Sequence, residues 1–171
     1  MNKGNKLLAF CLVCVLCIGC DRITKDLARA HLKNHEPISW LHNSFRLEYV
    51  ENTGAFLSLG EHWPPEISFW CLSVLPLMVL LGFFISLLRR YQVLPFVQML
   101  PFALILAGGL GNIIDRLLYN RHVTDFMNLG VWGLRTGIFN FADLQVTTGI
   151  LLMLLVRFRG PASGNLAAGK I

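Results

Sequence analysis

Charged residues are scarce in this chain of 171 residues. Asp, Glu, Lys and Arg together make up 15% of it, whereas an average soluble domain has about 25%. Apolar residues make up 54%, the mean hydropathy is +0.56, and the apolar residues are concentrated in long blocks. This distribution excludes an ordinary soluble domain and indicates an integral membrane protein.

The chain also lacks the motifs of several common enzyme and binding classes. No Ser-His-Asp or Cys-His pattern is present, and no basic stripe with interleaved aromatic residues predicts nucleic-acid binding. The histidines have no metal-ligand spacing; they are His31, His35, His42, His62 and His122. Carboxylates therefore remain as the candidate chemical groups.

Cysteines are confined to the apolar blocks and predict no disulfide framework. Four of them recur at three-residue intervals, at Cys11, Cys14, Cys17 and Cys20. At ~100° per helical residue the first and last lie on opposite faces, so they cannot share one metal ion, and we interpret them as packing residues. Cleavage before a lipidated Cys20 is an alternative interpretation of the N-terminus. We favour a retained helix, because a leucine usually stands at the position of Cys17 and three further spans follow.

Four apolar blocks predict four membrane helices in a single domain, 1–160, followed by a tail at 161–171. The helices are expected at about 7–26, 67–88, 94–113 and 141–157, with outer loops at 27–66 and 114–140. Each block is near the ~20 residues that cross the hydrocarbon core, and in lipid a helix satisfies its own backbone hydrogen bonds.

The distribution of charge predicts the orientation of these helices. The N-terminus, the 89–93 turn and the tail carry seven basic residues and no acid; these are Lys3, Lys6, Arg89, Arg90, Arg157, Arg159 and Lys170. All ten acidic residues lie on the other side. The positive-inside rule therefore places both termini in the cytoplasm.

Both outer loops contain short strand patterns. Residues 45–49 alternate strictly between apolar and polar residues after a turn at Asn43-Ser44, and Val131-Trp132 lies between two glycines. We expect a small hairpin in each loop.

Three acids at the membrane boundary are the strongest functional signal, because an ionisable group beside lipid is costly. Asp115 is followed by Arg116, so a structural ion-pair network is favoured for it. Asp125 and Asp143 lie at opposite ends of one outer loop, which can bring them together, although capping the last helix would alone explain Asp143. Paired carboxylates can hold a water between an acid and a base, as in aspartic peptidases. A proton channel or transporter is disfavoured, because the middles of the second and fourth spans are almost wholly apolar.

Several motifs together resemble the bacterial lipoprotein signal peptidases (signal peptidase II). They are Asp21-Arg22-Ile23-Thr24-Lys25, Asn52-Thr53-Gly54-Ala55, Gly108-Gly109-Leu110-Gly111-Asn112-Ile113-Ile114-Asp115-Arg116, Val123-Thr124-Asp125-Phe126 and Phe139-Asn140-Phe141-Ala142-Asp143. The resemblance covers the chain to about residue 157. It implies a mainly α membrane protein with four transmembrane helices and a small extracytoplasmic β-cradle, supplied by residues 38–56 and 128–139.

The resemblance also implies an activity and a set of site residues. Asp125 and Asp143 would be the catalytic pair of an intramembrane aspartyl endopeptidase, with no cofactor and no metal. The residues that line or support the site would be Asp21, Lys25, Asn52, Gly54, Asn112, Asp115, Arg116 and Asn140. The partners would be membrane lipid and diacylglyceryl-modified prolipoproteins, cut before the lipidated cysteine at the outer face of the cytoplasmic membrane by a monomer. An inactive scaffold of the same architecture is the alternative.

One departure from the family pattern concerns substrate preference. The family usually has a second alanine after Gly-Ala, whereas here Ala55 is followed directly by Phe56. This shortened motif is expected to alter how the cradle loop closes over a substrate.

Overall fold

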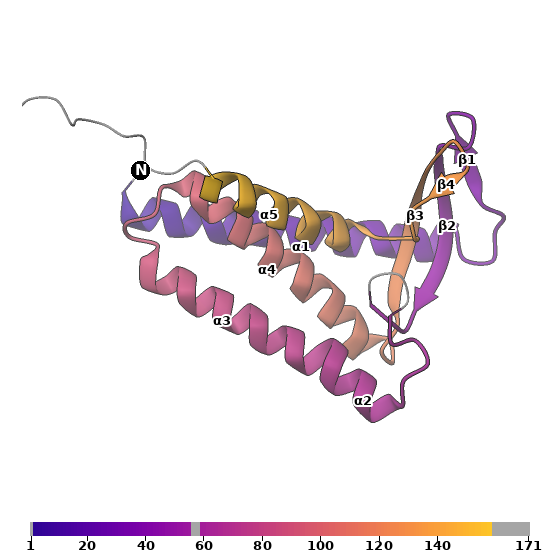
Figure 1. The fold of residues 1–171 in the computed structure, drawn as a ribbon, viewed down its shortest axis with the longest axis horizontal. Coiled ribbons are helices and arrows are strands. Elements are labelled where there is room, and N and C mark those ends of the chain that lie inside the picture. The colour runs from indigo at the N-terminus through magenta and orange to yellow at the C-terminus, as the bar shows by residue number, and fades with distance from the viewer. Residues whose placement is uncertain (1, 56–58, 159–171) are drawn as a thin grey trace, which may run out of the picture.

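The computed structural model describes residues 2–55 and 59–158. Helical segments pack side by side, and a small sheet lies at one end of them (Figure 1). Among the described residues, three helices are long and apolar enough to cross a membrane: Lys3–His31, Pro65–Arg90 and Phe96–Leu118. Phe141–Leu155 is a shorter apolar helix. The predicted fold class, a mainly α membrane protein with a small β-sheet, is confirmed. Phe56 and the predicted tail at 161–171 lie outside the described residues.

Helix α1 (Lys3–His31) is longer at both ends than the predicted span. Its first turn is capped by Asn2, whose side chain accepts a hydrogen bond from the Asn5 N–H at 2.8 Å. Its last turns are polar in sequence but continue the helix and bury Lys25 and Ala28. A hydropathy pattern does not reveal this extension, because it lies beyond the apolar block.

The second span contains a helical irregularity. It begins as α2 (Pro65–Phe69), passes through a π-helical turn η1 (Trp70–Val74) and continues as α3 (Leu75–Arg90). Pro76 is near the start of α3 and has no N–H to donate to the preceding turn, so the hydrogen-bond ladder changes at this point.

Helix α4 (Phe96–Leu118) is central and packs against α1, α3 and α5 (Phe141–Phe158). It continues past the predicted end near residue 113, so Asp115 and Arg116 are helical. Small residues let α4 approach α5 closely: a Cβ at Gly108 would overlap the carbonyl oxygen of Ala142. The apolar core beneath comprises Phe10, Leu80, Leu87, Met99, Ala103, Ile105, Leu106 and Ile113.

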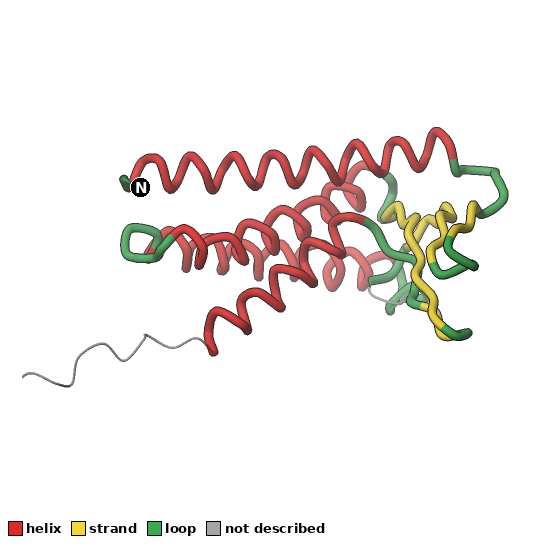
Figure 2. The backbone as a smooth tube through the Cα atoms, turned by 90° about the horizontal axis from the view of Figure 1, so that it is seen from above, coloured by secondary structure: helices red, strands yellow, loops and turns green. Residues whose placement is uncertain are grey.

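The sheet is antiparallel with the strand order β1-β2-β3-β4. Its strands are β1 (Ile38–Trp40), β2 (Phe45–Asn52), β3 (Val123–Val131) and β4 (Leu134–Arg135). Both predicted hairpins are present, as β1–β2 and β3–β4. Strand β3 begins before the segment 128–139 that was expected for the cradle, so Asp125 lies on the strand itself. The strands cross the ends of the helices, and Figure 2 shows the sheet confined to one end of the bundle.

Candidate active site

Asp125 is held on β3 by two side-chain amides and is 3% exposed. Its Oδ2 accepts a hydrogen bond from Asn52 Nδ2 at 2.9 Å, and its Oδ1 accepts one from Asn140 Nδ2 at 2.6 Å. Asn52 is the last residue of β2, and the register Asn52↔Val123 sets it near Asp125. Asn52 Oδ1 accepts from the Gly54 N–H at 2.8 Å, which directs the Asn52 amide N–H groups toward the carboxylate.

Asp143 lies in the first turn of α5, where a reciprocal capping arrangement holds it. The Asp143 N–H donates to Asn140 Oδ1 at 3.0 Å, and the Asn140 N–H donates to Asp143 Oδ2 at 3.1 Å. The other carboxylate oxygen, Asp143 Oδ1, accepts a hydrogen bond from Asn112 Nδ2 at 2.8 Å. The helix dipole at this position favours a negative charge.

Asn140 and Asn112 join the two carboxylates into one network. Asn140 is fully buried, and its Nδ2 donates both to Asp125 Oδ1 and, at 3.1 Å, to Asn112 Oδ1. Asn112 in turn donates to Asp143. The loop ends that were predicted to meet therefore do so, with β3 supplying one acid and α5 the other.

The electrostatics of Asp125 differ from those of an exposed carboxyl. Burial raises the pKa of Asp125 to about 7, and the negative charge of Asp143 acts in the same direction. The hydrogen bonds from Asn52 and Asn140 lower this pKa and oppose the larger effects. Asp125 can therefore hold a proton near neutral pH.

A buried ionic cluster centred on Lys25 supports the carboxylate network. The Lys25 ammonium lies 2.9 Å from each of three oxygens: Asp21 Oδ2, Asp115 Oδ2 and Asn112 Oδ1. Asp21, Lys25 and Asp115 are all fully buried. Asp21 Oδ1 also accepts from the Ala142 N–H at 3.0 Å, so the cluster connects α1 and α4 to the start of α5.

Asp115 and Arg116 turn in different directions from adjacent positions on α4. Asp115 pairs with Arg22 and with Arg29, the latter at 3.3 Å, in addition to Lys25. Arg116 Nη2 donates to the Gly54 carbonyl oxygen at 2.7 Å. Its buried Nε has no hydrogen-bond partner within the described part of the chain.

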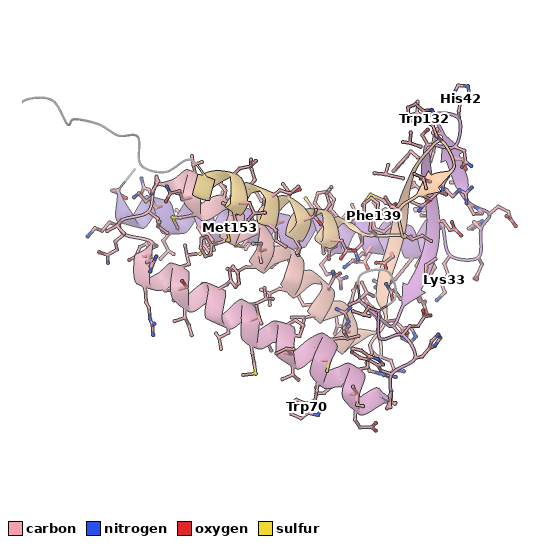
Figure 3. The ribbon with its side chains drawn as sticks, in the orientation of Figure 1. Lys33, His42, Trp70, Trp132, Phe139 and Met153 are labelled. Carbon is pink, nitrogen blue, oxygen red and sulfur yellow. The ribbon has the colours of Figure 1, made fainter. Side chains whose placement is uncertain are left out.

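A cavity of about 490 Å³ opens beside the two carboxylates. Its wall includes the predicted site residues Asn52, Asn112, Arg116, Asp125 and Asp143. Its remaining lining comprises Ala55, Val123, Leu129, Arg135, Thr136, Gly137, Ile138, Phe139, Leu144 and Thr147. Figure 3 shows Phe139 between the sheet and the helix bundle. The volume falls within the range of about 300–1,000 Å³ that is typical of ligand pockets.

Sequence reasoning missed three arginines near this site. Arg22 and Arg29 both donate to Asp115. They are separated by seven positions, about two turns of α1, and therefore lie on one face of the helix. This spacing was a signal that one acid pairs with both. Arg135 lines the cavity and donates through Nε to Asn128 Oδ1 at 2.5 Å. No pattern in the sequence marked Arg135.

The predicted residues divide into two groups in space. Asn52, Asn112, Arg116, Asp125 and Asp143 reach the cavity. The supporting positions Asp21, Lys25, Asp115 and Asn140 lie behind it, fully buried, and Gly54 contributes backbone atoms. No group of three or more His, Cys, Asp or Glu side chains arranged for a metal ion occurs among residues 2–55 and 59–158.

Comparison with known proteins agrees with the motifs. The family model for signal peptidase (SPase) II matches residues 13–159. The chain is 34% identical over 155 residues to the lipoprotein signal peptidase of Pelodictyon phaeoclathratiforme, with 85% of this chain and 88% of that protein covered. It is 31% identical over 154 residues to that of Streptococcus pneumoniae, covering 90% and 95%. A solved bacterial membrane enzyme has the same fold, with a TM-score of 0.74, 22% identity and coverage of 95% and 94%. The chain therefore belongs to the signal peptidase II family of bacterial membrane proteases.

Proposed function

We propose that this protein is an aspartic endopeptidase that removes signal peptides from diacylglyceryl-modified lipoprotein precursors. It cuts immediately before the lipidated cysteine, and Asp125 and Asp143 are its catalytic pair. The observation that supports this most directly is the hydrogen-bond network that runs from Asp125 through Asn140 and Asn112 to Asp143 at the wall of one cavity. Membership of the signal peptidase II family supports the choice of substrate class.

The two acids have different roles at the start of the reaction. Asp143, as the anion, takes a proton from a water molecule, and the water oxygen attacks the carbonyl carbon of the scissile peptide. Asp125 begins protonated and donates its proton to the carbonyl oxygen, which gives a neutral gem-diol. The proton on Asp143 then passes to the amide nitrogen, the C–N bond breaks, and a diol proton returns to Asp125.

The pKa of Asp125 supports this division of roles. A general acid must hold its proton at the working pH and still release it in the transition state, so a pKa near that pH is favourable. Burial raises the pKa of Asp125 to about 7. The Asp143 carboxylate accepts two hydrogen bonds at a helix N-terminus, which suits the base.

The remaining site residues position these two or bind substrate. Asn52, Asn112 and Asn140 orient the carboxylates, and the Lys25 cluster supports Asn112 from behind. Arg116 lines the cavity, and its guanidinium supplies N–H donors for a carbonyl oxygen of the substrate backbone.

The orientation in the membrane follows from the charge at the end of the bundle opposite the sheet. Lys3 donates to Gln92 Oε1 at 2.9 Å, and Lys6 donates to the Leu94 carbonyl oxygen at 2.9 Å. The N-terminus therefore lies beside the turn that follows Arg89 and Arg90, and the positive-inside rule assigns this end to the cytoplasm. The sheet and the carboxylates then lie at the outer face, where a single peptidase domain, 1–160, receives a lipid-anchored substrate and acts as a monomer.

The test is processing of a lipidated precursor, read as a shift on a gel, by purified protein and in cells that lack their own lipoprotein signal peptidase. Asp125→Asn and Asp143→Asn should each reduce cleavage by at least about 100-fold, because a positioned acid or base contributes about 10²–10⁴-fold. Membrane insertion of each variant is measured alongside.

Asp26→Asn is the matched control. Asp26 is also an acid at the sheet end of the bundle, but its side chain is 65% exposed and pairs only with Arg29 within the described residues. This variant should cleave at the wild-type rate. Cleavage at the wild-type rate by either Asp125→Asn or Asp143→Asn would refute the catalytic assignment. An inserted wild-type protein without activity would support an inactive scaffold instead.

A further inference from the structure

The β3–β4 hairpin ends in large apolar side chains that the described protein leaves uncovered. Trp132 is 100% exposed, Leu134 is 81% exposed and Val131 is 58% exposed. We call Val131–Leu134 the hairpin tip. Exposed single apolar residues are common, but three together at one turn indicate a surface that contacts something other than water.

The apolar face of the hairpin tip continues from the wall of the catalytic cavity. Leu129 lines that cavity, and Val131, two positions along the same strand, points to the same side of the sheet. Leu134 pairs with Val131 across the hairpin and so shares this side. An apolar strip therefore runs from Leu129 through Val131 to Leu134, out from the cavity.

The other side of the hairpin is polar and occupied. Asn128 and Arg135 form a hydrogen bond at 2.5 Å, and Arg135 Nη1 donates to the Asn43 carbonyl oxygen at 2.8 Å. A Cβ at Gly130 would meet the Arg135 side chain, which confirms that Arg135 lies over this polar face. The hairpin is therefore amphipathic: Asn128 and Arg135 hydrogen-bond on its polar side, whereas Val131 and Leu134 on its apolar side are uncovered.

The position of the hairpin tip identifies what lies against it. The strands cross the helix ends, and the end of the sheet that carries β1 and β4 projects sideways beyond α1 and α5 (Figure 1). Trp132 lies at this projecting end (Figure 3). Because the helices cross the bilayer, a segment that projects sideways at their ends extends over lipid. Tryptophan is enriched at this level of a membrane, where its ring is apolar and its N–H remains hydrated.

We propose that the hairpin tip inserts its apolar face, led by Trp132, into the leaflet on the sheet side of the membrane. This interaction surface is separate from the catalytic carboxylates and does not depend on the proposed function. It holds the cavity wall formed by Leu129 and residues 135–139 at the lipid surface.

Tryptophan fluorescence can test this contact, because the chain has only four tryptophans. The triple variant Trp40→Phe, Trp63→Phe, Trp70→Phe leaves Trp132 as the sole reporter. The full-length protein is placed in phosphatidylcholine vesicles with or without bromine on the upper acyl chains. Trp132 should emit at shorter wavelength than a hydrated tryptophan, and bromine should quench most of its emission.

Two matched reporters set the limits of this measurement. A variant that retains only Trp70 reports lipid contact, since this residue lies on the second span and is 62% exposed. Lys33→Trp in a tryptophan-free chain reports water, because Lys33 lies beyond the end of α1 (Figure 3). Should the triple variant fail to fold, the difference in bromine quenching between wild type and Trp132→Phe supplies the same information.

Two results would overturn the proposal. Quenching of Trp132 no greater than that of the Lys33→Trp reporter would place the hairpin tip in water. Short-wavelength emission that bromine does not quench, and that depends on the protein-to-lipid ratio, would mean that a second copy of the chain covers it.

Discussion

Asn52 offers a direct test of the titration of Asp125. Its Nδ2 donates to Asp125 Oδ2 at 2.9 Å, and this bond lowers the pKa of Asp125. Burial and the charge of Asp143 raise that pKa more strongly, to about 7. Asn52→Ala removes a hydrogen bond that lowers the pKa of Asp125, so this pKa should rise further.

The magnitude follows from the value of a hydrogen bond to a charged group, about 1.5–3 kcal/mol. One pKa unit corresponds to about 1.4 kcal/mol, so the pKa of Asp125 should rise by about 1–2 units. Activity requires the proton on Asp125, which is lost as the pH rises through this pKa. The alkaline limb of the activity profile, expected near pH 7 in the wild type, should therefore move to higher pH in Asn52→Ala.

The same titration affects stability. The pKa of Asp125 is higher in the folded protein than in the unfolded chain, so the folded state binds this proton more tightly. Protonation of Asp125 therefore stabilises the fold. This stabilisation is fully present below the pKa of the unfolded chain, about 4, and is lost as the pH rises through the pKa of the folded protein, about 7. Removing the charge with Asp125→Asn should flatten that part of the stability profile.

The assay is kcat/KM for a lipidated precursor across the alkaline limb, in lipid nanodiscs, for wild type and Asn52→Ala. Asn128→Ala is the matched control: Asn128 is also a buried amide of the sheet, but it bonds to Thr136 and Arg135. Its removal can lower the rate, but it should leave the position of the limb unchanged. An unmoved limb in Asn52→Ala, or one displaced to lower pH, would refute the assignment of Asp125 as the titrating acid.

Two further changes test the ionic cluster and the helix contacts around it. Lys25→Met removes the nearer cation of the buried Asp21 and should lower the free energy of unfolding by about 3–5 kcal/mol. Adding Asp21→Asn should recover most of this loss in thermal unfolding, and no recovery would mean that the Asp21 charge is not the cause. Gly111→Ala places a Cβ 2.6 Å from Asp21 Oδ2 and should lower the unfolding midpoint, with a cost of about 1–3 kcal/mol. Gly82→Ala, with no atom within 4 Å of the added Cβ, is its control and should be neutral or stabilising; equal effects of the two substitutions would contradict the contact.

Hydropathy and local alternation predicted the elements that depend on local sequence. The apolar blocks predicted the four helices, and the alternation in 45–49 and the glycines around Val131-Trp132 predicted the two hairpins. The boundaries were less accurate, because polar residues continue α1 and α4 beyond the apolar blocks. The hydropathy pattern contained no signal for the π-helical turn at Trp70–Val74.

The connections within the site depend on pairing between distant segments. Strand β2 pairs with β3, so Val50 lies opposite Asp125 although the second and third spans separate the two residues in sequence. No local pattern contains that register. The apolar block that begins at Phe141 did predict that Asp143 lies in the first turn of a helix, but not that Asn140 would donate to Asp125. The sequence thus indicated which residues gather, while the direction of each hydrogen bond came only from the fold.

Those directions are determined by the charges behind the site. Lys25 donates to Asn112 Oδ1, so the Nδ2 of Asn112 must turn toward Asp143. A flipped Asn112 amide would set its N–H groups against an ammonium and its oxygen against a carboxylate. With Asn112 Oδ1 fixed as an acceptor, Asn140 directs Nδ2 to it and to Asp125, and keeps its own Oδ1 for the Asp143 N–H. The ammonium of Lys25, which is fully buried, therefore orients both carboxylates through two neutral amides.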